Sequence, residues 1–266
     1  METFMPRFSL LDVDVDALSR SELLNVIEQA IETDQSNYIV GNHNLHSVYL
    51  CRKDAEMRRF YEHAGTIHID GMSLVMLGKL LGLPLSRHHR TGYLDWFDDF
   101  LALAKKKHWR LYFVGGTPEV AARVPGLLNR RYPGLAVAAH HGYLGGNLGA
   151  AERAQVYREI EALQPQVLLV GMGMPLQEHF ILESLHSVEV NVILQCGAIM
   201  DFYAGEKRPA PRILGQLGLE WLFRLGSEPR RLASRYLAEP VHLLPPLLRE
   251  MLPRMRVQPG SIAIRR

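Results

Sequence analysis

Three short stretches of this chain combine glycine with side chains that bind or transfer chemical groups. Asp70-Gly71 follows an apolar run, residues 171–178 (GMGMPLQE) follow a second, and Cys196-Gly197 follows a third, with Asp201 close behind. Glycines placed after apolar strands let the backbone approach a phosphate or a ribose closely. A carboxylate such as Asp70 can accept a proton from an alcohol. The spacing therefore indicates a ligand pocket with a candidate general base.

The C-terminal part of the chain adds positive charge beside large apolar side chains. Residues 206–266 hold 12 Lys and Arg against 5 Asp and Glu, a net charge of +7, whereas residues 1–205 hold 18 against 23, a net charge of −5. A basic, leucine-rich segment on an acidic body favours a diphosphate or lipid head groups as partner over nucleic acid. Its phosphate-capable side chains are Arg208, Arg212, Arg224, Arg230, Arg231 and Arg235.

Apolar runs of strand length alternate with helical patterns along most of the chain. Ser19 and Glu22 form a capping-box signature, and Thr117 followed by Pro118 is a typical helix start. We expect helices over 149–163 and 176–186, and strands at 38–40, 67–69, 110–114, 136–139, 167–170 and 191–194. Runs such as VLLVG are apolar on both faces, as in parallel strands covered by helices.

These patterns predict an α/β fold, a Rossmann-like, mostly parallel sheet flanked by helices, with a helical C-terminal appendage. Residues 1–205 would form the catalytic core with a nucleotide pocket. Residues 206–266 would form a basic, apolar appendage that covers the site and docks on a membrane. Ligands of such sheets lie beyond the carboxyl ends of the strands. The polar and glycine residues expected at that rim are Asn42, Asn44, Asp70, Gly115, Gly116, Gly171, Gly173 and Gly197.

Several residues admit a second interpretation. Asp70 is a candidate general base, but it could equally be the N-cap of the helix that follows. The Asp-x-Asp pattern within residues 12–16 could hold a cation, although an edge strand and turn with exposed acids fit its place better. His43 and His46 lie near the expected site and are candidate substrate contacts. We expect no metal ligands.

The end of the chain carries an apolar stripe beside arginines. Core packing, a dimer seam and binding in a membrane interface are all compatible with this pattern. The chain has no cationic N-terminal region followed by an apolar run, and no uncharged apolar run of membrane-spanning length. We therefore expect a peripheral protein at the cytoplasmic face of the cell membrane. The stripe consists of Leu243, Leu244, Leu247, Leu248, Met251 and Leu252.

Together these residues resemble the WecG/TagA/CpsF glycosyltransferases of bacterial envelope and exopolysaccharide synthesis. The resemblance implies an inverting, metal-independent enzyme without cofactors. Its donor would be a UDP-sugar and its acceptor a polyprenyl-diphosphate-linked saccharide. The motifs that carry the resemblance are Asn44, Asp70-Gly71, Arg90-Thr91-Gly92, LYFVGG, the 171–178 segment, AGEKRPAP, GLEWLFRL and EPRR.

The resemblance also assigns roles. Asp70 would deprotonate the acceptor hydroxyl, and Asn42 and Asn44 would orient the sugars. The residues expected to hold the nucleotide, its sugar and its diphosphate are Arg90, Gly115, Gly171, Gly173, Gln177, Glu178, Gly197, Asp201, Arg208, Arg212, Arg224 and Arg231.

Two other functions are alternatives. A non-catalytic, membrane-associated scaffold of a polysaccharide assembly complex would keep the apolar tail but would not depend on Asp70. A nicotinamide-dependent oxidoreductase fits less well, because the chain has no G-x-G-x-x-G followed by an acidic residue.

Overall fold

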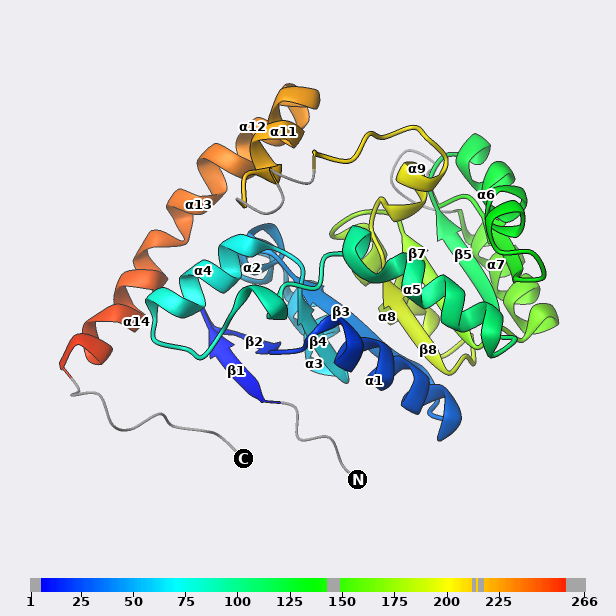
Figure 1. The fold of residues 1–266 in the computed structure, drawn as a ribbon, viewed down its shortest axis with the longest axis horizontal. Coiled ribbons are helices and arrows are strands. Elements are labelled where there is room, and N and C mark those ends of the chain that lie inside the picture. The colour runs from blue at the N-terminus through cyan, green and yellow to red at the C-terminus, as the bar shows by residue number, and fades with distance from the viewer. Residues whose placement is uncertain (1–5, 143–148, 212–213, 215–217, 257–266) are drawn as a thin grey trace.

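The core of the protein is a single parallel sheet (Figure 1). The computed structural model describes residues 6–142, 149–211, 214 and 218–256. Six strands, all parallel, lie in the order β4-β3-β8-β7-β5-β6, so the predicted, mostly parallel sheet is confirmed. The strands are β3 (Tyr38–His43), β4 (Thr66–Ile69), β5 (Arg110–Gly115), β6 (Ala136–His140), β7 (Val167–Gly171) and β8 (Val192–Gln195).

Helices cover both faces of this sheet, because its strands are apolar on both sides. One buried cluster joins α1, α5, α6 and α9 to the strands, and another joins α3, α7 and α8 to the opposite face. The helices of the core are α1 (Arg20–Glu32), α2 (Leu45–Cys51), α3 (Ala55–His63), α4 (Met72–Leu80), the short 3-10 helix η1 (Arg87–His89), α5 (Tyr93–Lys106), α6 (Pro118–Arg131), α7 (Ala150–Leu163), α8 (Leu176–Ser184) and α9 (Ile199–Tyr203).

Both helix starts predicted from the sequence are confirmed. The Ser19 hydroxyl accepts from the Glu22 backbone N–H, and the Glu22 carboxylate in turn accepts from Ser19 N–H. Thr117 caps α6 by accepting from Val120 N–H, with Pro118 at the first helical position. These local signals fix where helices begin, which in turn places the preceding turns at the edge of the sheet.

The Asp-x-Asp segment lies in a two-stranded antiparallel hairpin, β1 (Arg7–Leu10) and β2 (Val13–Asp16). The expected strand and turn are therefore confirmed, but the expectation that all its acids are exposed is wrong. Asp16 is buried, because its carboxylate pairs with Arg7 at 2.8 Å and accepts from the Ile67 backbone N–H at 2.7 Å. This carboxylate is bound by groups of the protein itself and holds the hairpin against β4.

The C-terminal segment forms a helical arm that runs past α2 and α4 (Figure 1). Leu243 is buried, and Leu247 and Met251 pack with it on the cluster that includes residues of α4. Within the described part of the chain, no helix has both the length and the apolar character needed to cross a membrane. The arm consists of α11 (Glu220–Ser227), α12 (Pro229–Ala233), the π-helical turn η2 (Ser234–Ala238), α13 (Glu239–His242) and α14 (Leu244–Arg256).

Two glycines allow the ends of β5 and β7 to meet. Gly115 and Gly171 are register partners. A Cβ built on Gly115 would lie 2.4 Å from the Gly171 carbonyl oxygen, and a Cβ on Gly171 would lie 2.5 Å from the Gly197 carbonyl oxygen. Backbone occupies the space on both sides, so a side chain at either position forces the strand ends apart.

We expect Gly115→Ala to lower the free energy of unfolding by at least about 2 kcal/mol, because the added methyl group clashes with backbone that cannot rotate away. Urea unfolding measures the loss. Gly126→Ala is the matched control: Gly126 is an exposed residue of α6 with space around it, so alanine there should be neutral or stabilising by up to about 1 kcal/mol. Equal changes in the free energy of unfolding at the two positions would contradict the close approach of the Gly115 and Gly171 backbones.

Candidate functional site

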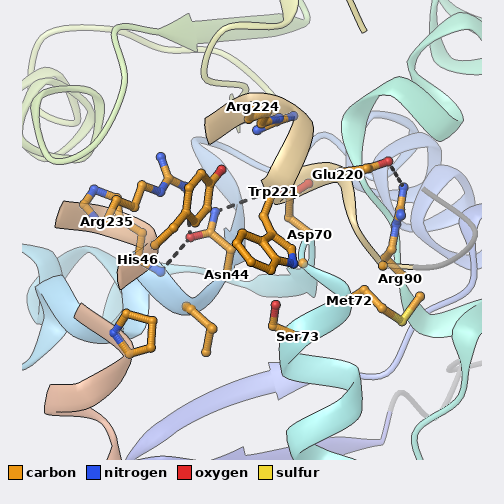
Figure 2. A pocket seen from close by; sticks show the side chains of 15 residues that line it. Asn44, His46, Asp70, Met72, Ser73, Arg90, Glu220, Trp221, Arg224 and Arg235 are labelled. Carbon is orange, nitrogen blue, oxygen red and sulfur yellow. Dashed lines mark hydrogen bonds and ion pairs between the residues drawn. The ribbon is translucent and has the colours of Figure 1, made fainter. Parts of the chain in front are cut away.

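The Asp70 carboxylate does not cap the helix that follows it. The N-cap of α4 is Gly71, which has no side chain, so the alternative that Asp70 caps this helix is wrong. Asn44 caps α2 instead, since its Oδ1 accepts from the backbone N–H groups of His46 and Ser47 at 3.0 and 3.2 Å. This fixes the Asn44 amide with its Nδ2 turned to Asp70, 3.4 Å from Oδ2 (Figure 2).

A large cavity opens at the carboxyl ends of the strands beside Asp70. We call it the main cavity; its volume is about 660 Å³. The turns after β3, β4, β7 and β8 form its floor, and residues of α11 and α12 line it from the arm. It brings together most of the residues singled out from the sequence: Asn42, Asn44, Asp70, Arg90, Gly173, Gln177, Gly197, Arg208, Arg224 and Arg231.

Of the residues assigned to the nucleotide, its sugar and its diphosphate, four that the structure describes do not line the main cavity: Gly115, Gly171, Glu178 and Asp201. Gly115 and Gly171 are register partners where the ends of β5 and β7 meet. Glu178 is buried in α8, and Asp201 forms an ion pair with Lys207. Arg212 lies outside the described residues.

A buried network connects two walls of the main cavity. The Gln195 side chain donates to Glu178 Oε1 at 2.6 Å and accepts from the Asn42 backbone N–H at 3.0 Å. Gln177 also donates to Glu178 Oε1, at 2.9 Å, while its own oxygen accepts from Gly197 N–H at 3.1 Å. Burial raises the pKa of Glu178 from 4.5 to about 7. Glu178 therefore supports the cavity from behind and positions the residues that line it.

Arg90 ties the core to the arm. Its guanidinium group lies 2.6 Å from the Asp95 carboxylate and 3.2 Å from that of Glu220 on α11. Figure 2 shows the contact with Glu220. A second contact joins His46 of α2 to Glu239 of α13, at 2.6 Å. Both links are partly shielded from solvent, so they hold the arm over Asp70 better than fully exposed pairs would.

Arg235 is a cation that sequence reasoning left unassigned. It lines the main cavity, and its Nη2 lies 3.4 Å from Asn44 Oδ1. Burial lowers its pKa, and the charges of Asp70 and Glu239 oppose that effect. Within the described residues no carboxylate forms an ion pair with it, so it can meet an anionic ligand. Its place after the EPRR motif was the available signal.

The two histidines named from the sequence have different places. His43 is fully buried against Tyr61, with ring centroids 3.8 Å apart, and does not line the main cavity. Burial lowers its pKa to about 3, so it stays neutral. His46, in contrast, lies at the base of the arm. In the described part of the chain no three His, Cys, Asp or Glu side chains group as metal ligands.

The Glu178 carboxyl predicts a pH-dependent stability. Because its folded-state pKa is raised, the folded protein holds a proton there that the unfolded chain releases, and stability falls as pH rises from about 4.5 to 7. We expect Glu178→Gln to abolish this loss, so that its free energy of unfolding relative to wild type rises by up to about 3 kcal/mol between pH 5 and pH 8.

Urea unfolding at the two pH values measures this difference. Glu183→Gln, an exposed carboxylate on the same helix, is the matched control and should leave the pH dependence of wild type unchanged. If the free energy of unfolding of Glu178→Gln differs from that of wild type by the same amount at both pH values, Glu178 does not titrate in this range.

Comparison with known proteins shows the family of the chain. The model of the glycosyl transferase WecG/TagA/CpsF family matches residues 8–257. Two similar proteins, from Staphylococcus aureus strains MRSA252 and NCTC 8325 / PS 47, are each named N-acetylglucosaminyldiphosphoundecaprenol N-acetyl-beta-D-mannosaminyltransferase. Each is 28% identical over 227 residues, which cover 82% of this chain and 84% of the relative. The chain therefore belongs to the glycosyl transferase WecG/TagA/CpsF family.

Proposed function

We propose that this protein transfers a sugar from a UDP-sugar to the saccharide of a polyprenyl-diphosphate carrier, with inversion at the anomeric carbon. Asp70 takes the proton of the acceptor hydroxyl as its oxygen bonds to the anomeric carbon, while the bond from that carbon to UDP breaks. The products are the lengthened carrier-linked saccharide and UDP. The relatives' name makes N-acetylmannosamine the first donor sugar to test, and carrier-linked N-acetylglucosamine the first acceptor.

The position of Asp70 carries this proposal. Its carboxylate lies at the carboxyl end of β4, open to the main cavity and not engaged as a helix cap. Asn44 limits its rotation from one side. A held carboxylate within reach of two bound substrates is what base-assisted attack by an alcohol requires.

The arm supplies most of the cations for the leaving group. Arg224, Arg231 and Arg235 of the arm, and Arg208 before it in the chain, line the main cavity together with Gly173 and Gly197. Guanidinium groups neutralise a departing diphosphate as a divalent metal does in other enzymes. We therefore propose that transfer proceeds without a metal.

The outer side of the arm fits a membrane surface. Leu237, Val241, Leu244, Leu248 and Leu252 recur every three or four residues and are all at least half exposed, opposite to the inward Leu243 side. We propose that this face, with the exposed Met76 and Leu80 of α4, lies in the membrane interface where the carrier resides.

We expect Asp70→Asn to lower kcat by about 10²- to 10⁴-fold, because the amide cannot accept the proton. The assay uses a short-chain lipid-diphosphate N-acetylglucosamine acceptor with a panel of UDP-sugars in EDTA, and wild type should transfer from at least one donor. Asp99→Asn, an exposed carboxylate of α5, is the control and should keep wild-type activity. Unchanged transfer by Asp70→Asn would show that Asp70 is not the general base. No transfer by wild type from any donor would favour the alternative function, a non-catalytic scaffold.

We expect the double variant Leu244→Glu, Leu248→Glu to lose most binding to vesicles that contain anionic lipids, since it places two charges on the apolar face. Co-sedimentation measures the bound fraction. Ala122→Glu adds a charge to the exposed side of α6 and should bind as wild type does. Retained binding by the double variant would show that another surface contacts the lipid.

A further inference from the structure

A second cavity adjoins the first one on the other side of Asp70. We call it the inner chamber; its volume is about 280 Å³. The first turns of α2 and α4 form one wall, and α11, η2 and α13 of the arm form the other (Figure 2). Asn44, Asp70, Arg224 and Arg235 line both cavities, so the carboxylate stands where the two meet.

The walls of the inner chamber differ in chemistry. On the arm side lie the rings of Trp221 and Tyr236, whose centroids are 6.1 Å apart. Figure 2 shows the Trp221 indole reaching from α11 toward the start of α4, near Asp70 and Ser73. On the core side lie Ser73, His46 and the Asn44 amide. A flat apolar surface facing several polar groups suits a pyranose, because one face of a sugar ring presents C–H groups while its rim presents hydroxyls.

The size of the chamber limits what enters it. Pockets for small ligands typically measure about 300–1,000 Å³, so the volume of the inner chamber is just below this range and that of the main cavity is well inside it. A nucleotide-sugar needs the larger space, and a single sugar residue fits the smaller one. Pro240 lines the chamber, and the next residue, Val241, belongs to the exposed apolar face. The chamber therefore ends beside the surface from which a lipid-linked substrate would arrive.

We propose that the inner chamber is the subsite for the acceptor sugar, with Trp221 as the platform for its ring. This inference rests on the proposed function and adds to it a separate cavity for each of the two substrates. The donor occupies the main cavity, and the acceptor sugar presents its hydroxyl to Asp70 from the other side. Because α11 carries Trp221 and is held to the core by the Glu220–Arg90 pair, the subsite exists only when the arm is docked.

The test compares Trp221→Ala and Trp221→Phe with Leu222→Ala, an exposed neighbour on the same helix. Calorimetry measures the binding of UDP and, separately, of a short-chain lipid-diphosphate N-acetylglucosamine. Steady-state transfer from UDP-N-acetylmannosamine gives both KM values. We expect Trp221→Ala to weaken acceptor binding and to raise the acceptor KM about tenfold, with UDP affinity and donor KM within twofold of wild type. Trp221→Phe should recover part of the loss, and Leu222→Ala should match wild type.

The outcomes separate this inference from the proposed reaction. If wild type transfers sugar and Trp221→Ala keeps acceptor affinity within twofold, the subsite is wrong and the reaction stands. If wild type transfers nothing but binds the acceptor analogue in a Trp221-dependent way, the subsite stands and the reaction is wrong. A loss of UDP affinity in Trp221→Ala without a loss of acceptor affinity would place Trp221 in the donor site and overturn the inference.

Discussion

The contacts of Arg90 hold together the parts on which this site depends. Its backbone forms a bridge to Ile69, the last residue of β4, and its side chain pairs with Asp95 of α5 and Glu220 of α11. One residue thus links the strand that precedes Asp70, a core helix and the arm. Asp70 keeps its place relative to the arm because these links converge beside it, and both cavities have Arg90 in their walls.

Much of the fold was predictable because its determinants are local. Apolar runs such as residues 167–170 mark covered parallel strands, and capping residues such as Thr117 mark helix starts. The burial of Asp16 was not predictable, because its partners Arg7 and Ile67 are brought together only by the packing of the hairpin on β4. The sequence pattern indicates whether a side chain lies on the buried or the exposed face of its strand or helix. Which groups it contacts there depends on the packing of segments far apart in the sequence.

The candidate site was predictable at the strand ends and less so elsewhere. Parallel order forces the turns after β3, β4, β7 and β8 to one edge, which brought Asn42, Asp70, Gly173 and Gly197 together as expected. Glu178 carries its motif but lies behind the cavity, since a helix places successive side chains on different faces. Trp221 and Arg235 depend on how the arm docks, and no periodicity in the sequence encodes that contact.

The size of the inner chamber has a consequence for the length of the product. A space of about 280 Å³ admits one sugar residue between Trp221 and the start of α4. Once that residue has been extended, the new terminal sugar projects toward the main cavity, and the lengthened saccharide cannot re-enter with its new end at Asp70. If the acceptor sugar binds in the inner chamber and the donor in the main cavity, the volume of the chamber limits the enzyme to one added sugar per carrier. Further elongation then requires other enzymes.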